Sequence, residues 1–507
     1  MKKKFAAIAA FALVLSGCSP QEPTQNANQG DSDPATGVAN PDAVVNLGFL
    51  LEPSGIDPTT VSGAALDQLV DDNVYEGLVR RMPSGDLEPT LAESWDVSDD
   101  GLTYTFSLRQ GVQFHDGSDF DAADVVATLE ASSAEDSKNP DAKLMHAFES
   151  ATEIDEKTVE ARLKEKDINF LEAMGSKAAM MVPSDNEVDL TTESNGTGPF
   201  RIGEWQTGNF ISLERNDDYW GEQAGVKEAV FNYYDDISAA ANALTSGQID
   251  ILTSSDADTR SRFEGDSSIQ TVEGDDTAYM TLAFNHENEA LQNKDVRSAI
   301  RMGIDKNGLI DALGTNATRI GSMVSPAQAW WDESLNEIDS YDPEAARALL
   351  QNAGFEDLSL NLRVANQYDP AVSEYIASQL GQIGINVDIQ PMEFSAWLDQ
   401  VYQKKEYDMT MVLQVDPWTL TYYGNPKYYW NYDNAEAQQL TDEALSASSF
   451  DERDEKLGEL ARFVSEDAAT EWLYSPKATQ HVRQGVSGFP TDRIGSRYYV
   501  ADITVED

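Results

Sequence analysis

The chain has 507 residues, of which 41% are hydrophobic and 24% are charged, and 35 basic against 89 acidic residues give a formal net charge of −54. This length and composition are those of a globular protein with more than one domain. The acidic charge repels nucleic acid phosphates and anionic lipid head groups, which excludes nucleic acid as a partner and direct binding of the protein body to a membrane surface.

The first residues have the order of an export signal. A basic start at Lys2–Lys4 is followed by the uncharged apolar run Phe5–Leu15. This run is shorter than the ~20 residues of a membrane-spanning helix, so we predict a signal peptide at 1–17 that is removed after export. The quartet Leu15-Ser16-Gly17-Cys18 resembles the bacterial lipobox, in which the cysteine receives a diacylglycerol and becomes the new N-terminus. An ordinary signal peptide with a chance cysteine is the alternative.

The segment 18–40 consists mostly of small and polar residues and has almost no bulky apolar side chains. Such a composition buries too little surface to compensate for the entropy lost on ordering. We therefore predict a lipidated tether, and ordered structure that begins after it.

No pattern typical of an enzyme or a metal centre is present. Cys18 is the only cysteine, which excludes disulfides within the chain, and an acylated cysteine cannot also be a thiol nucleophile. The chain has no GxSxG, HExxH or Walker motif. The four histidines are scattered without metal-ligand spacing, at His115, His146, His286 and His481. We therefore predict no catalytic residue, no metal and no cofactor.

The N-terminal half begins with a mixture of strands and helices. The apolar run Val44–Leu50 predicts a buried strand, and the apolar spacing over Leu66–Val79 predicts a helix. Alternating large residues predict strands at Thr103–Arg109 and Val112–Phe114. Asp121 is a typical N-cap for the helix that follows it.

Farther on, strands and helices alternate. The glycine-rich Gly196–Pro199 is predicted to be a structural turn before a strand, because no helix with a basic residue follows it to bind phosphate. Asp342, Pro343 and Gly354 fit the cap, first turn and stop of one helix. Beyond it come a strand, a helix and a strand, at Leu358–Val364, Ser373–Ile383 and Ile385–Ile389. This alternation indicates an α/β fold.

A last apolar strand, Tyr407–Val415, ends at Asp416-Pro417-Trp418. Ligands of open α/β sheets collect at the carboxyl ends of strands, so Asp416 is a candidate ligand contact. Seven large rings follow within fifteen residues, at Trp418, Tyr422, Tyr423, Tyr428, Tyr429, Trp430 and Tyr432. They fit equally well the wall of an apolar pocket and the packing of a loop on its own domain.

A series of short motifs in a fixed order resembles the large peptide-binding family of extracytoplasmic solute-binding proteins of ABC importers, solute-binding family 5. The motifs are Ile56–Pro58, Tyr75–Val79, Leu91–Trp95, Asp100–Phe106, Leu108–Gly117, Ala123–Val125, Gly196–Phe200, Ser246–Asp250, Asp295–Ile300, Ile304–Asp305 and the helix that ends at Gly354. The resemblance covers nearly the whole chain after the signal peptide.

The resemblance implies an α/β, two-lobed periplasmic-binding-protein-like fold of type II, in the large class with an extra subdomain. Hinge motion would close the lobes over a ligand. Mapped on this sequence, lobe I takes 41–85, 190–283 and 479–507, the inserted subdomain 86–189, and lobe II 284–478.

The resemblance also implies site residues. In peptide-binding relatives an aspartate at the end of the late strand holds the N-terminal ammonium of the ligand, and Asp416 falls on that position. Ser62-Gly63-Ala64 matches the edge that offers backbone hydrogen bonds to an extended ligand. Asn366, shortly before Tyr368, stands where dipeptide binders have an arginine, which argues against dipeptide specificity. Trp418, Tyr422 and Tyr368 complete the predicted ligand contacts.

We therefore expect a non-enzymatic, monomeric binding protein for oligopeptides, held to the outer face of the cell membrane by its lipid anchor. Its partners would be a permease and the ATPases of an importer. Alternatives with the same fold bind an oligosaccharide or, with so few histidines, less plausibly a nickel chelate. A lipid-anchored surface hydrolase or an adhesin is the alternative from another class.

Overall fold

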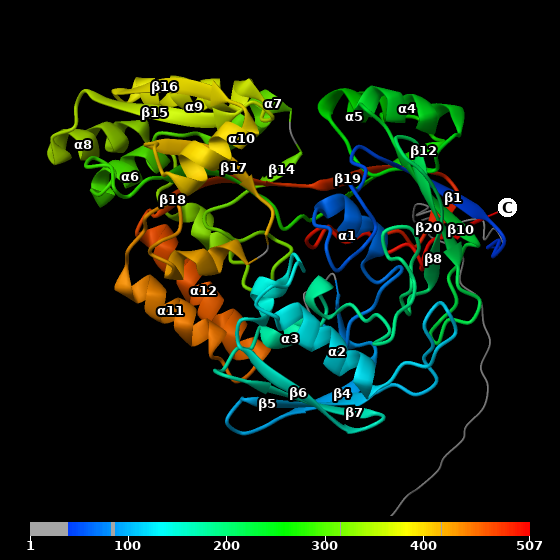
Figure 1. The fold of residues 1–507 in the computed structure, drawn as a ribbon. Helices are drawn as coiled ribbons and strands as arrows, with labels where there is room; N and C mark the ends of the chain where they lie inside the picture. Colours follow the sequence, from blue (N-terminus) through cyan, green and yellow to red (C-terminus); the bar gives the residue numbers. More distant parts are fainter. Residues whose placement is uncertain (1–38, 83–86, 315, 417, 507) are drawn as a thin grey trace, which may run out of the picture. The chain divides into compact units, whose positions relative to one another are not determined.

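Figure 1 shows a computed structural model of the chain, which describes residues 39–82, 87–314, 316–416 and 418–506. Cys18 and the predicted signal peptide at 1–17 lie outside the described residues, as does most of the predicted tether at 18–40. Within the described ranges, no helix is both long and apolar enough to cross a membrane.

The first lobe is built on a seven-stranded mixed sheet in which β1 runs parallel to both of its neighbours, β10 and β11. In sheet order, its strands are β12 (Ile269–Gly274), β19 (Ala478–Arg483), β11 (Ile251–Leu252), β1 (Val44–Phe49), β10 (Glu228–Tyr233), β9 (Phe210–Arg215) and β8 (Phe200–Gln206). The helices of this lobe are α1 (Ala64–Val70), α4 (Ile237–Ser246) and α5 (Ala257–Phe263). Helices α4 and α5 pack beside β11 and β12 (Figure 1).

The second lobe has a six-stranded sheet with helices on both faces. In sheet order, its strands are β14 (Ala317–Arg319), β18 (Thr470–Pro476), β13 (Tyr279–Phe284), β17 (Met409–Gln414), β15 (Leu358–Ala365) and β16 (Ile385–Met392). Its helices are α6 (Lys294–Met302), α7 (Lys306–Leu313), α8 (Pro343–Ala353), α9 (Pro370–Gln382), α10 (Phe394–Trp397), α11 (Ala435–Leu445) and α12 (Phe450–Glu466).

Alternation along β13 divides this lobe into two cores. Tyr279 and Ala283 pack on the side of α11 and α12, whereas Leu282 and Phe284 pack on the side of α6, α8 and α9. Successive side chains of a strand point to opposite faces, so one strand supplies both cores. The predicted lobe boundary after residue 283 is therefore wrong for β13, which pairs with β17 and β18 in the second sheet.

A four-stranded antiparallel sheet forms the core of the predicted insert together with α2 (Ala122–Ser133) and α3 (Phe170–Ala173). In sheet order, its strands are β4 (Ala92–Val97), β5 (Thr103–Leu108), β7 (Thr158–Leu163) and β6 (Phe148–Asp155). Two small ribbons pair β2 (Val79–Arg81) with β3 (Leu87–Pro89) and β20 (Val486–Ser487) with β21 (Thr504–Val505). Short helical turns are η1 (Ala142–Met145), η2 (Lys177–Ala179), η3 (Glu333–Glu337), η4 (Leu398–Gln403) and η5 (Thr419–Gly424).

Two short connections join the two large sheets. Residues 275–278 lead from β12 to β13, and Lys477 alone separates β18 from β19. The Lys477 ammonium pairs with the Asp275 carboxylate, so the two connections are tied together. Short paired crossings of this kind are the places where a hinge motion concentrates its backbone changes.

Most predicted elements are confirmed, and two are corrected. The helix predicted over Leu66–Val79 ends at Val70, because Asp71 is extended and Asp72 has a left-handed φ of 60°. Val112–Phe114 is not a strand: only Gln113 forms a bridge, to Asp119, around a tight turn at Gly117.

The predicted roles of the capping residues and of the glycine turn are confirmed. Asp121 forms a capping box with Asp124 at the start of α2, and Asp342 accepts two backbone hydrogen bonds at the start of α8. A Cβ on Gly196 would lie 2.0 Å from the Val74 carbonyl oxygen, so this glycine allows two backbone segments to touch. Its role is structural.

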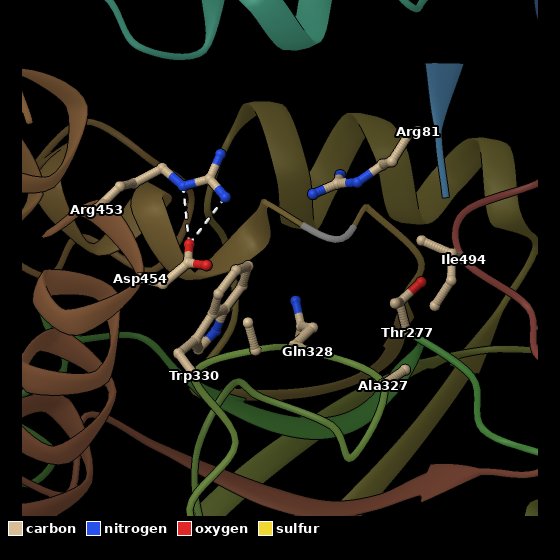
Figure 2. A pocket seen from close by; sticks show the side chains of 9 residues that line it. Arg81, Thr277, Ala327, Gln328, Trp330, Arg453, Asp454 and Ile494 are labelled. Atoms are coloured by element: carbon tan, nitrogen blue, oxygen red, sulfur yellow. Dashed lines mark hydrogen bonds and ion pairs between the residues drawn. The ribbon is translucent and has the colours of Figure 1, made fainter. Parts of the chain in front are cut away.

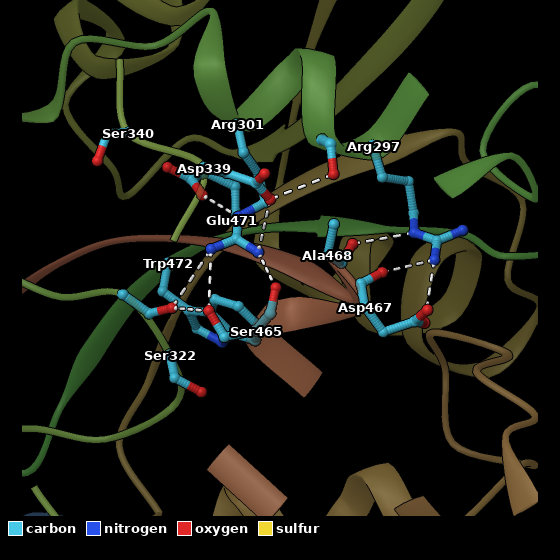
Figure 3. Close-up of polar contacts among 12 residues, drawn as sticks. Arg297, Arg301, Ser322, Asp339, Ser340, Ser465, Asp467, Ala468, Glu471 and Trp472 are labelled. Carbon is cyan, nitrogen blue, oxygen red and sulfur yellow. Dashed lines mark hydrogen bonds and ion pairs between the residues drawn. The ribbon is translucent and has the colours of Figure 1, made fainter. Parts of the chain in front are cut away.

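Charged side chains are buried together in the second lobe. Glu471 is fully buried, and its two carboxylate oxygens lie 3.1 Å from Arg301 Nε and 3.1 Å from Lys306 Nζ. Figure 3 shows the Arg301 guanidinium among Glu471, Asp339 and Ser465. Such a group is held by mutual pairing, since any one of its charges left alone would be strongly unfavourable.

Candidate ligand site

A cavity of about 560 Å³ lies among the end of α1, the turns η1 and η2 of the insert, the loop after β17 and the C-terminal segment near Arg497. Pockets of ~300–1,000 Å³ hold small organic ligands. These walls come from both lobes and the insert.

Asp416 lies in this cavity just beyond the carboxyl end of β17. Its Oδ1 accepts a hydrogen bond from the Trp418 backbone N–H (2.9 Å), and its Oδ2 accepts one from the Tyr422 hydroxyl (2.8 Å). Burial and the Asp416 charge together raise the pKa of Tyr422, which keeps its hydroxyl a donor. No ion pair joins Asp416 to a cation in the described part of the chain. The carboxylate is thus fixed in direction and available to a cationic group.

Trp418 contacts charged groups from two distant parts of the chain, β2 and α12. Arg81 and Arg453 lie 4.8 Å and 4.9 Å from its ring centroid, and Trp330 stacks on it at 5.7 Å. Cation–π contacts of desolvated guanidinium groups are worth ~2 kcal/mol. Much of the Trp418 ring is therefore already covered.

The same two arginines share one carboxylate. Oε1 of Glu172, from the insert, lies 3.3 Å from Arg81 and 2.9 Å from Arg453. Figure 2 shows the two guanidinium groups pointing toward one another, with Asp454 bound to Arg453. Both arginines line a small cavity of about 20 Å³. These contacts join β2, α3 of the insert and α12.

The aromatic stretch serves both of the purposes that the sequence left open. Four of its rings, Tyr423, Tyr429, Trp430 and Tyr432, are buried in the core of the second lobe. Trp418 and Tyr422 line the cavity, and Tyr428 stacks on Tyr422 at 4.7 Å. The packed rings hold the loop so that Asp416 and Tyr422 face the cavity.

The other predicted contacts lie outside this cavity. Ser62, Gly63 and Ala64 are exposed at the start of α1. Asn366 is exposed and donates a hydrogen bond to Glu393. The Tyr368 hydroxyl accepts one from the Leu413 N–H, in β17 (3.1 Å). Of the predicted contacts, Asp416, Trp418 and Tyr422 thus line the cavity. Ser62–Ala64, Asn366 and Tyr368 do not.

Several charged residues of the cavity were missed by the sequence analysis. Asp67 and Asp71 are four residues apart, in the first turn and at the C-cap of α1, a spacing that puts both on one face and could have been noticed. Lys143 and Lys177 from the insert, and Arg497 from the C-terminal segment, supply cations that no local pattern connects with Asp416. Across the described ranges, no group of three metal-ligating side chains was found.

Comparison with known proteins places this fold in a family. The sequence pattern of bacterial extracellular solute-binding proteins, family 5, matches residues 86–439. Heme-binding protein A of Haemophilus influenzae is 24% identical and aligns over 87% of this chain and 83% of its own. The oligopeptide-binding protein AppA of Bacillus subtilis is 25% identical over 94% of each chain.

A solved structure of similar fold is the periplasmic binding protein DppA of Helicobacter pylori in complex with the peptide STSA. It has a TM-score of 0.75 and 23% identity, and the match covers 92% of this chain and 98% of that one. The two-lobed α/β fold with its inserted subdomain is therefore shared. This chain belongs to the bacterial extracellular solute-binding proteins of family 5, which bind solutes outside the cytoplasm for ABC transporters and are not enzymes.

Proposed function

We propose that this protein captures oligopeptides in the cavity between its lobes and delivers them to the permease and ATPases of an ABC importer. The observation that carries the proposal is Asp416, whose carboxylate is oriented by two donors and forms no ion pair with any cation of the described ranges. A peptide's N-terminal ammonium would form charge-assisted hydrogen bonds there. The names of relatives such as the oligopeptide-binding protein AppA support a peptide.

Two other ligand classes fit the cavity less well. An oligosaccharide stacks on aromatic faces, but the Trp418 ring is already in contact with Arg81, Arg453 and Trp330. Heme carries two propionate carboxylates, which the carboxyl groups of this cavity would repel. Six of them line it, at Asp67, Asp71, Asp141, Asp167, Glu172 and Asp416. A ligand with a cationic end suits this lining better.

Calorimetric titration of the full chain tests the proposal. Tripeptides to pentapeptides with free amino termini are expected to bind, and a panel of oligosaccharides of matched size is expected to give no heat of binding. Binding of the sugars with none of the peptides would overturn the proposal. Hydrolysis of a bound peptide during the titration would contradict a pure binding role.

The cations of the cavity support a place for the peptide's carboxylate. Asn366 is exposed outside the cavity, whereas Lys143 lines the cavity, is exposed and has no carboxylate within ion-pair distance among the described residues. We assign the C-terminal carboxylate, in ligands short enough to reach it, to Lys143. Lys143→Met should weaken tripeptides about tenfold and leave their C-terminal amides unchanged in calorimetry. Equal weakening of acids and amides would contradict this assignment.

We propose further that Cys18 carries a diacylglycerol that anchors the protein outside the cytoplasm. Its support is the basic and apolar start of the chain and the Leu15-Ser16-Gly17-Cys18 quartet. A tethered receptor remains near its permease at a raised local concentration.

Replacing Cys18 by Ser should abolish the anchor. In detergent phase separation of producing cells, nearly all of the parent protein is expected in the detergent phase and nearly all of Cys18→Ser in the aqueous phase. A Ser16→Ala variant keeps a small residue before the cysteine and serves as the control. Retention of Cys18→Ser in the detergent phase would refute lipidation at this residue.

A further inference from the structure

A second acidic cluster lines the cavity on walls other than that of Asp416. Asp67 lies in the first turn of α1, Asp71 is the C-cap of this helix, and Asp141 lies just before η1 of the insert. The Lys177 ammonium, from η2, binds the Asp67 carboxylate and lies 4.0 Å from Asp141 Oδ2. One lysine thus stands among three carboxyl groups.

Asp71 is the incompletely paired member of the cluster. Its side chain lines the cavity although the residue is only 7% exposed. Its Oδ2 lies 3.5 Å from Arg497 Nε, whereas its Oδ1 has no hydrogen-bond partner. Nearly all buried polar atoms of proteins are paired, so an orphan carboxylate oxygen beside a cavity is a sign of a missing partner.

The charges around Asp71 do not balance. Arg497 also pairs with Asp72 at 3.4 Å, and Arg80 acts on Asp72 as well. Three cations, Lys177, Arg497 and Arg80, thus face the four carboxyl groups of Asp67, Asp71, Asp72 and Asp141. Burial, and then the charge of Asp67, raise the pKa of Asp71 to about 8, against the opposing effects of Arg497 and Lys177. The unpaired Oδ1 and these charges both favour the protonated form of the Asp71 carboxyl group.

We propose that Asp71, with Asp67 and Asp141, forms a second cation subsite that selects peptides with a lysine or arginine side chain. The inference rests on the proposed function and adds a side-chain preference to it. A ligand ammonium or guanidinium beside these carboxyl groups supplies the positive charge that the cluster lacks. Its binding favours the ionised form of Asp71, so the proton of Asp71 is released as the basic side chain enters.

Two isosteric peptides test the subsite. Calorimetry of the full chain compares Ala-Lys-Ala with Ala-norleucine-Ala, which differ in the ammonium group. The wild-type protein should bind the lysine peptide about tenfold or more tightly, as expected for hydrogen bonds to a charged group. Asp71→Asn, which keeps the shape of the side chain, should remove most of this preference and leave the norleucine peptide unchanged. Glu130→Gln, which removes one charge from an exposed position on α2, should leave both affinities unchanged.

Proton release distinguishes a ligand-facing Asp71 from one with a structural role. Titrations at pH 7 in buffers of different ionisation enthalpy should show close to one proton released per lysine peptide bound by the wild type. They should show far less for the norleucine peptide or for Asp71→Asn. Asp141→Asn, at the half-buried edge of the cluster, should reduce the preference for lysine less, and it provides the test if Asp71→Asn does not fold.

The outcomes separate the subsite from the general function. Equal wild-type affinity for the two peptides, or a preference for lysine that survives both substitutions, would overturn the subsite and leave peptide capture intact. Failure of both peptides to bind the wild type would overturn the proposed function and the subsite together.

Discussion

Replacing Asp416 by Ala is expected to weaken binding of a peptide with a free amino terminus by at least about 30-fold, which corresponds to about 2 kcal/mol or more. The loss is large because the ligand's ammonium would be enclosed in the cavity without its counter-charge. Asp416→Asn keeps the acceptor of the Trp418 N–H but should weaken peptide binding nearly as much, because the ammonium requires the negative charge. Calorimetry at constant ionic strength measures both variants.

Acetylated peptides provide the internal control for Asp416. An acetylated terminus has no charge, so these peptides should bind the wild type weakly and be nearly indifferent to the substitution. Asp388→Ala removes one carboxylate from an exposed position on β16 and should leave both kinds of peptide unaffected. Unchanged affinity of free-terminus peptides for Asp416→Ala would refute the anchor.

Replacing Arg301 by Met should lower the free energy of unfolding by about 3–5 kcal/mol, because Glu471 would keep a buried charge with only Lys306 beside it. The hydrogen bonds of the guanidinium with the Ser465 carbonyl and hydroxyl oxygens would be lost as well. Denaturant unfolding followed by tryptophan fluorescence is a suitable measurement, since Trp472 is buried beside Arg301.

An exposed ion pair supplies the matched control for Arg301. Arg162 and Glu149 are 3.0 Å apart, and their side chains are 61% and 49% exposed. Arg162→Met should lower the free energy of unfolding by only about 0–1 kcal/mol. If the two substitutions destabilise the protein equally, the buried cluster of Figure 3 does not hold the second lobe together as described.

Local patterns predicted most of the elements because their signals lie within a few residues. The Asp342 cap and the Gly354 stop fix α8 independently of the rest of the fold. The end of α1 was not predictable in this way. Leu66–Val79 keeps a helical spacing of apolar residues, but after Val70 these residues pack on other segments rather than on one face of a helix.

The site was only partly predictable for a similar reason. Asp416 could be identified because it follows a buried strand, a relation within the local sequence. The neighbours Tyr422 and Tyr423 look alike in sequence, yet one lines the cavity and the other is fully buried in the core. The pairing of Asp71 with Arg497 joins residues more than 400 positions apart, and only the fold brings them together.

The most direct test of peptide capture is a competition between ligand classes. The full chain is incubated with an equimolar mixture of short peptides and oligosaccharides, separated from unbound solute by gel filtration and denatured, and the released molecules are identified by mass spectrometry. We expect peptides with free amino termini to be released, enriched in lysine and arginine if the second subsite operates. Release of oligosaccharides in place of peptides would contradict the account.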